Sequence, residues 1–233
     1  RLEYRGYDSA GIATLNNGNL GRRRSLGKLA ELSDLLVRDP LLGKSGIGHT
    51  RWATHGKPSV NNAHPHMTAE VAVVHNGIIE NFQELREYLQ KRGIQHTTDT
   101  DTETIALLTQ AMIEDGHEPI EAAKKTIDKL TGAFALCFLF EGHNDLMVIA
   151  RKGSPLAIGI GKGEMFVGSD AIALSPMTNK ISYLEEGDFA VLTRANVQVW
   201  DHSGALVERE IKTINTQKTQ VQKDGYQHFM EKE

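Results

Sequence analysis

Cysteine is almost absent from this sequence. Its 233 residues contain a single cysteine, Cys137, so a disulfide framework like that of small secreted domains is excluded and a cytoplasmic location is expected. Cys137 lies within the apolar run AFALCFLF, residues 133–140. A thiol in such a run is expected to be buried, to have a raised pKa and to be a poor nucleophile.

Long apolar segments and a basic excess are also lacking. The longest apolar run, AFALCFLF, is far shorter than the roughly 18 residues needed to cross a bilayer, and no charged-then-apolar leader opens the chain. The formal charge is -4 and the pI is near 6.2, with one short cationic cluster at residues 22–24. We therefore expect no binding to membranes or to nucleic acid.

The residues that are present predict an α+β fold. Hydrophobic residues make up 39% of the chain and charged residues 24%, which is ordinary for a globule with a sizeable core. Strand patterns precede helical patterns, which occupy residues 81–93, 100–116 and 118–132. Short β-rich segments follow from residue 133 onward. This order favours mostly antiparallel sheets layered against helices over an alternating βαβ fold.

Local signals mark the ends of some elements. The dipeptide Asn76-Gly77 closes the apolar stretch VAVV and predicts a turn. Asn81 is predicted to cap the first helix of the middle region, and Thr100 or Thr102 to cap the second.

Both ends of the sequence suggest a larger protein. The chain begins with Arg1 rather than methionine, so we expect that residues before it have been removed. We assign residues 1–211 to one domain. Residues 212–233 are polar and end in the helix-like YQHFMEKE, which is typical of a linker into a further domain.

The stretch HTRWATHGKPSVNNAHPH, residues 49–66, contains four histidines. His64 and His66 have the His-x-His spacing that zinc hydrolases use on a strand. Pro65 interrupts a central strand, however, and no carboxylate partner stands at a recognisable offset. We therefore predict that this pair makes hydrogen bonds and holds no metal.

Each of the other polar motifs allows two interpretations. Arg51, beside Trp52, could bind a carboxylate bidentately with its planar guanidinium group, or it could form an ion pair on an edge strand. Asn76 and Gly77 could donate to an oxyanion or simply make a turn. Asp101, in TDTDTET, could bind a ligand or satisfy backbone N–H groups at a helix start.

Five stretches, in order along the chain, together resemble one family. They are LEYRGYDSAGIA (2–13), HTRWATHGKPSVNNAHPH (49–66), VVHNGIIENFQELR (73–86), TDTDTETIA (98–106) and SPLAIGIGKGEMFVGSD (154–170). The chain is similar to the glutaminase domains of glutamine–fructose-6-phosphate aminotransferases (isomerising), which are class II glutamine amidotransferases. Other members of that class share the HNG element but differ where this chain has TRWATHG.

The resemblance implies a fold and an activity. The family fold is the N-terminal-nucleophile (Ntn) hydrolase sandwich, with four αββα layers built around two antiparallel sheets. The family hydrolyses L-glutamine to glutamate and ammonia, and transfers the ammonia to fructose 6-phosphate to give glucosamine 6-phosphate. It uses no cofactor. An isomerase domain, beyond the sequence given, would hold the sugar phosphate, and the full-length protein would be a homodimer.

The resemblance also implies roles for particular residues. Arg51 would bind the α-carboxylate of glutamine, and Asp101 its α-ammonium group. Asn76 and Gly77 would form the oxyanion hole. The remaining matched residues would line or cover the site or lie near the nucleophile: Trp52, Thr54, His55 and Arg5.

The sequence departs from the family pattern at the nucleophile. The family uses an N-terminal cysteine in a Cys-Gly-Ile start, whose α-amine, with an ordinary pKa of about 7.7–8.0, serves as the base. Such a residue would lie upstream of Arg1, so we expect the chain as given to be inactive alone. Two alternatives stay open: a metal-dependent amidohydrolase using His64 and His66, and a non-catalytic glutamine-binding module.

Overall fold

The structure, a computed structural model, describes residues 6–53 and 56–214. Arg5, Thr54 and His55 therefore lie outside the described residues, as does the chain from residue 215 onward, with the expected terminal helix. The described part forms one large sheet, two smaller sheets and five helices.

The large sheet has seven strands and is antiparallel throughout. In spatial order its strands are β13 (Leu206–Val207), β12 (Val197–Trp200), β11 (Phe189–Leu192), β7 (Met147–Lys152), β6 (Gly132–Phe140), β5 (Val71–Ile79) and β4 (His66–Met67). The apolar run in β6 is buried on both faces, as expected of a central strand covered on both sides.

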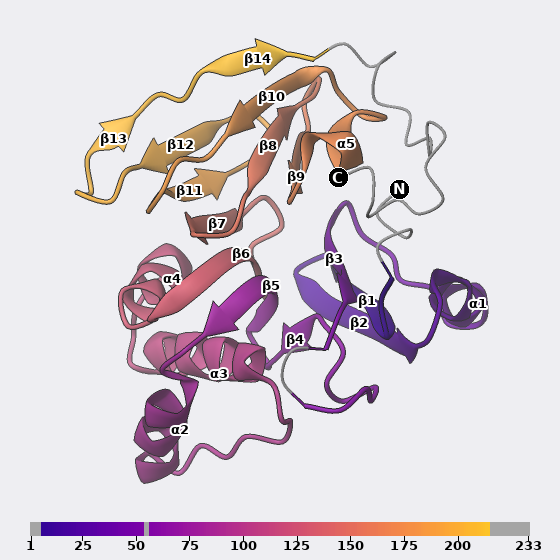
Figure 1. Cartoon of the computed structure of the whole chain (residues 1–233), viewed down its shortest axis with the longest axis vertical. Coiled ribbons are helices and arrows are strands. Elements are labelled where there is room, and N and C mark those ends of the chain that lie inside the picture. The colour runs from indigo at the N-terminus through magenta and orange to yellow at the C-terminus, as the bar shows by residue number, and fades with distance from the viewer. Residues whose placement is uncertain (1–5, 54–55, 215–233) are drawn as a thin grey trace.

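Three helices cover one face of this sheet (Figure 1). They are α2 (Phe82–Lys91), α3 (Asp101–Glu114) and α4 (Pro119–Ile127). Because successive strand residues point to opposite faces, Val73 and Leu136 pack under the helices. Ala72 and Cys137, one position away from each, face the opposite side.

Two smaller sheets lie over that opposite side. One contains β2 (Asn19–Leu26), β1 (Ser9–Asn16) and β3 (Ser45–Arg51), and the other contains β14 (Ile211–Thr213), β10 (Lys180–Tyr183), β8 (Ala157–Ile160) and β9 (Met165–Gly168). Ala13, Ile47 and Ile158 from these sheets share one apolar cluster with Leu139 and Ile149 of the large sheet.

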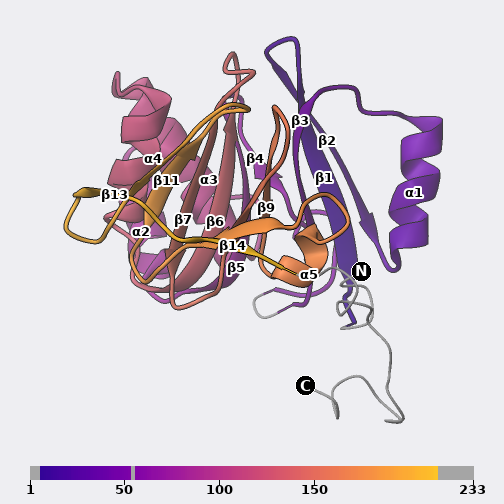
Figure 2. The same ribbon diagram turned by 90° about the horizontal axis from the view of Figure 1, so that it is seen from above.

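The remaining helices flank the smaller sheets. α1 (Leu29–Arg38) contacts β1 and β2, and α5 (Ala171–Leu174) contacts β8 and β9. Figure 2 shows the layers in order: the helices α2 to α4, the large sheet, the smaller sheets and α1. The α+β prediction is confirmed.

The predicted turn at Asn76-Gly77 is wrong. β5 continues through both residues to Ile79, and β6 pairs with it along its whole length, from Val71↔Phe140 to Ile79↔Gly132. The local Asn-Gly signal is overridden because nine residues of neighbouring strand are already in register. Gly77 adopts a φ of +125° there, a conformation that glycine permits.

The two predicted helix caps have different outcomes. Thr100 is the N-cap of α3, and its side chain accepts a hydrogen bond from the Glu103 backbone N–H, as predicted. Asn81 precedes α2 but makes no side-chain cap. Its amide instead donates to the Lys129 carbonyl and accepts from the Thr131 N–H. It therefore ties the start of α2 to the loop before β6.

Two further observations concern the limits of the domain. β14 begins at Ile211, where we expected the domain to end, and pairs with β10 as far as Thr213. Among the described residues, the helices are all too short or too polar to cross a membrane.

The close approach of β6 at Gly77 predicts a specific effect on stability. A Cβ at Gly77 would lie 2.0 Å from the Ala133 carbonyl oxygen, whereas one at Gly93, which also has positive φ, meets nothing within 4 Å. Gly93→Ala should therefore lower the free energy of unfolding by about 1 kcal/mol through backbone strain alone. Gly77→Ala should lower it by more than about 3 kcal/mol.

Urea titration followed by circular dichroism measures both values. Equal losses for Gly77→Ala and Gly93→Ala would contradict the pairing described for β5 and β6.

Candidate functional site

The period-two alternation of β3 directs particular side chains between the sheets. Ser9↔Arg51, Gly11↔His49 and Ala13↔Ile47 are partners in the β1–β3 register. Ile47 faces the core between the sheets, so His49 and Arg51, two and four residues further on, project from the same face. This places two polar side chains at the end of an otherwise apolar layer.

These side chains open onto a small polar pocket of about 230 Å³. It is formed by the ends of β3 and β5, the loop before β4 and the first turn of α3. It is lined by His49, Thr50, Arg51, Trp52, His64, His75, Asn76, Gly77, Thr100, Asp101 and Thr102. All of the site residues predicted from the sequence that the structure describes are in this set.

The Arg51 side chain is held in place by acceptors within the chain. It is 3% exposed, its Nη1 lies 3.4 Å from Asp8 Oδ1, and its Nη2 donates to the Gly56 carbonyl at 3.0 Å. The other Asp8 oxygen accepts from the Ala53 N–H at 2.6 Å. Asp8 therefore supports both Arg51 and the chain that follows it.

Asp101 enters the pocket at the first residue of α3. It is 4% exposed, and its Oδ2 accepts a hydrogen bond from the Ile79 N–H at 2.9 Å. This bond joins the start of α3 to the end of β5. Trp52, by contrast, is 64% exposed, so its indole lies at the rim of the pocket.

Two buried histidines, which we call the histidine wall, lie against the start of α3. His64 also lines the small pocket, whereas His66 does not. His64 Nε2 lies 2.9 Å from Thr102 Oγ1, and His66 Nε2 lies 2.9 Å from Thr100 Oγ1. Both members of the pair thus make the hydrogen bonds expected from the sequence. Within residues 6–53 and 56–214, no group of three or more His, Cys, Asp or Glu side chains is arranged to hold a metal ion.

The histidine wall is electrostatically neutral. Burial lowers the pKa of both His64 and His66 well below its usual value, and neighbouring cationic groups add to the effect. Burial likewise lowers the pKa of His49 to about 4, against the opposing hydrogen bond to Asn76.

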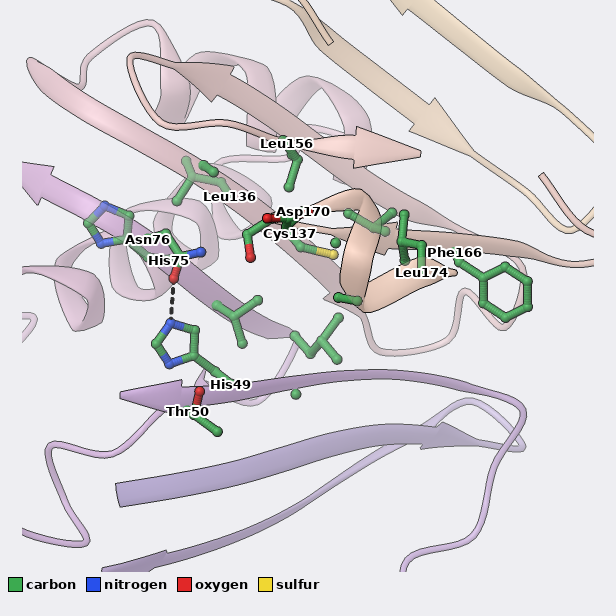
Figure 3. Close-up of a pocket in the computed structure, with 18 of the residues that line it drawn as sticks. His49, Thr50, His75, Asn76, Leu136, Cys137, Leu156, Phe166, Asp170 and Leu174 are labelled. Atoms are coloured by element: carbon green, nitrogen blue, oxygen red, sulfur yellow. Dashed lines mark hydrogen bonds between the residues drawn. The ribbon is translucent and has the colours of Figure 1, made fainter. Parts of the chain in front are cut away.

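The Asn76 side chain lies on the inner face of the sandwich. Its Oδ1 lies 2.7 Å from His49 Nε2, a contact drawn in Figure 3. Sequence reasoning assigned no role to His49 or Asp8. The alternation of β3 is the signal that could have found His49. Asp8 could not be found in this way, because only the folded chain brings it to Arg51.

A larger cavity of about 980 Å³ adjoins the small pocket. It runs along the edges of β3 and β9 and shares His49, Trp52 and Asn76 with the small pocket. Cys137 also lines it (Figure 3), but burial raises the pKa of this thiol to about 12. The expectation of an unreactive thiol thus agrees with the structure.

Comparison with known proteins defines the class. The model of the glutamine amidotransferase domain family matches residues 49–176, more than half of the chain. The chain therefore belongs to the glutamine amidotransferase family.

The similar curated proteins carry one name. The glutamine–fructose-6-phosphate aminotransferase (isomerizing) of Brucella abortus biovar 1 is 57% identical over 233 residues. The protein of that name from Bradyrhizobium diazoefficiens is 58% identical over the same length. Each match includes 100% of this chain but 38% of the relative, so the chain spans well under half of their length.

Solved structures share the fold. The glutamine phosphoribosylpyrophosphate amidotransferase from B. subtilis, complexed with ADP and GMP, has a TM-score of 0.74 at 26% identity and covers 88% of this chain and 45% of its own. A structure described as the allosteric regulatory enzyme of purine biosynthesis has a TM-score of 0.74 at 25% identity, covering 92% and 50%. The layered sandwich predicted from the resemblance is thus the Ntn-type amidotransferase fold.

The neutral histidine wall predicts a pH dependence of stability. The folded-state pKa of His64 is depressed, so its contribution to stability is fully present above the unfolded pKa of about 6.5 and is lost as the pH falls toward the folded value. Between pH 6 and 5 the unfolded chain binds a proton at His64 that the folded chain does not. His64→Gln should therefore make the fall in unfolding free energy shallower by about 1 kcal/mol per pH unit.

Urea titrations at several pH values measure this slope for both proteins. An identical slope in His64→Gln would show that His64 takes up its proton without unfolding.

Proposed function

We propose that this domain binds L-glutamine in the small polar pocket and hydrolyses its side-chain amide to glutamate and ammonia. The observation that carries the proposal is the composition of one pocket: it contains an arginine, an aspartate and an Asn-Gly pair. A free amino acid bears a carboxylate and an ammonium group on one carbon. A site that recognises both groups needs a positively charged and a negatively charged side chain.

In this proposal Arg51 binds the α-carboxylate and Asp101 binds the α-ammonium group. The bonds that hold the two side chains support these roles, because Asp8 and Gly56 orient Arg51 and the Ile79 N–H orients Asp101. A ligand would then meet groups that are already positioned, which reduces the ordering that binding requires.

The proposed reaction proceeds through a tetrahedral intermediate. A thiolate adds to the amide carbon, and negative charge forms on the amide oxygen, where Asn76 and Gly77 donate hydrogen bonds. The nitrogen then takes up a proton and leaves as ammonia, and water cleaves the resulting thioester to release glutamate and restore the thiol. Hydrogen-bond donors aimed at such an oxygen act chiefly in the transition state.

The thiol in this proposal comes from a cysteine upstream of Arg1, because the pKa of Cys137 is too high for a nucleophile at neutral pH. The large cavity offers a route for that segment. It lies along the edges of β3 and β9, and an unpaired strand edge accepts an extended chain through backbone hydrogen bonds. Such a strand could end beside Asn76, which lines the same cavity.

The names of the similar proteins support a proposal for the fate of the ammonia. We propose transfer to fructose 6-phosphate, giving glucosamine 6-phosphate, on an isomerase domain of the same protein that begins after a linker within residues 212–233. A homodimeric full-length protein in the cytoplasm is part of the same proposal. Arg5, Thr54 and His55 keep the roles that the resemblance implies, near the nucleophile and over the bound glutamine.

A glutamine-binding module without catalysis is the second candidate. The same pocket would serve it, and the upstream residue alone distinguishes the two.

The test compares forms of the domain extended at the N-terminus. A form that begins with Cys-Gly-Ile should release glutamate and ammonia from L-glutamine, and one that begins with Ala-Gly-Ile should bind glutamine without hydrolysing it. In the active form Asn76→Ala should lower kcat roughly 10²- to 10³-fold, with a nearly unchanged KM, because the donor is needed mainly in the transition state.

Glutamate production measured at several glutamine concentrations gives both constants. Glutamine binding without hydrolysis by the Cys-initiated form would favour the binding module. Turnover that depends on Cys137 would contradict the proposed nucleophile.

A further inference from the structure

The Asn76 side chain has two chemically opposite ends. Its Nδ2 group donates two hydrogen bonds, whereas its Oδ1 only accepts. A rotation of 180° about the last side-chain bond exchanges these ends with little change in shape. If Oδ1 faced a developing oxyanion, two negative oxygens would repel each other. The proposed oxyanion role therefore requires a contact that selects one orientation of the amide.

His49 makes that contact. Its Nε2 lies 2.7 Å from Asn76 Oδ1, across the gap between β3 and β5. Figure 3 shows the imidazole directed at the amide from the opposite strand. Asn76 itself is exposed to the cavity, so the histidine is the neighbour that restrains an otherwise accessible side chain.

The hydrogen-bond partners available to the two ring nitrogens of His49 indicate which nitrogen carries the proton. The low pKa of His49, about 4, makes its ring neutral at pH 7, with one N–H. Its Nδ1 is buried and has no hydrogen-bond partner in the described part of the chain. A proton on Nδ1 would leave a buried donor unsatisfied, which costs roughly 1–3 kcal/mol. We therefore assign the proton to Nε2, from which it is donated to Asn76 Oδ1.

The position of the His49 ring is itself restrained. The His64 ring packs against it with centroids 4.3 Å apart and the planes tilted by 30°. His64 Nε2 in turn lies 2.9 Å from Thr102 Oγ1 in the first turn of α3. On the strand beside it, Gly11 is the register partner of His49. A Cβ at Gly11 would lie 2.1 Å from the His64 carbonyl oxygen, so this glycine permits the loop bearing His64 to approach.

We propose that His49 is a positioning residue of the amidotransferase reaction: it holds the Asn76 amide so that Nδ2, not Oδ1, faces the oxyanion site. The inference rests on the proposed function of Asn76. It assigns His49 no contact with glutamine and no proton transfer. His49 acts only through the orientation of Asn76, so its loss should affect the transition state more than the bound substrate.

The test uses matched variants of the Cys-initiated form. Phe keeps a ring that can stack on His64 but has no N–H, whereas Gln carries an amide N–H at about the reach of the imidazole Nε2. We expect His49→Phe to lower kcat roughly 10- to 100-fold with KM changed less than about threefold, and His49→Gln to stay within about fivefold of the unsubstituted domain.

A double-mutant cycle separates positioning from general structural damage. When Asn76 is already alanine, adding His49→Phe should lower kcat by less than about twofold, because the group that His49 orients is gone. Independent, multiplying effects of the two substitutions would overturn the proposal. So would an unchanged kcat in His49→Phe, or equal losses in the Phe and Gln variants when urea titration shows both to be folded.

A second measurement needs neither turnover nor a substitution. In ¹⁵N NMR of the unsubstituted domain, His49 should have a protonated Nε2 and an unprotonated Nδ1 at pH 7. The opposite tautomer would overturn the proposal even if His49→Phe failed to fold. Absence of glutamine hydrolysis by the unsubstituted Cys-initiated form would count against the proposed function, and the tautomer result would then decide only whether His49 fixes the orientation of the Asn76 amide.

Discussion

The continuous pairing of β5 with β6 is the constraint on which the rest of the site depends. It keeps the backbone of β5 extended from Val71 to Ile79. Asn76 and Gly77 are thereby held as strand residues beside the small polar pocket rather than in a turn. The same extension presents the Ile79 N–H to Asp101, which joins the strand to α3.

Strand alternation then determines which groups meet. On β3 it directs Ile47 into the core and brings His49 and Arg51 to the polar end of the same face. On β5 it directs Asn76 toward β3 and His75 toward α3, where His75 Nδ1 lies 3.0 Å from Thr102 Oγ1. The charged side chains of Arg51 and Asp101 and the Asn76 amide therefore surround one small pocket. His49, His64 and His66 stay uncharged because burial disfavours their protonated forms.

Sequence reasoning reached the features that depend on local chemistry. The apolar run of β6, the Thr100 cap and the α+β layering follow from patterns within a few residues, and the family resemblance singled out Arg51 and Asp101, which the structure brings to one pocket.

The features that sequence reasoning missed depend on contacts between distant segments. The Asn-Gly pair is a strand because β6 lies beside it, and residues 22–24 form part of β2 although they read as a cationic cluster. Arg22 and Arg24 donate to loop carbonyls, and Arg23 pairs with Asp39. Likewise, the partnership of His49 with Asn76 spans 27 residues of sequence, so no short motif could predict it.

The central claim is that one pocket binds both charged groups attached to the α-carbon of glutamine. Calorimetric titration of the Ala-initiated extended form tests it most directly, because that form should bind without turnover. The account predicts that L-glutamine binds and that N-acetyl-L-glutamine and L-glutamine α-amide, which lack the ammonium and the carboxylate respectively, bind at least about tenfold more weakly. Equal affinity for all three compounds would contradict it.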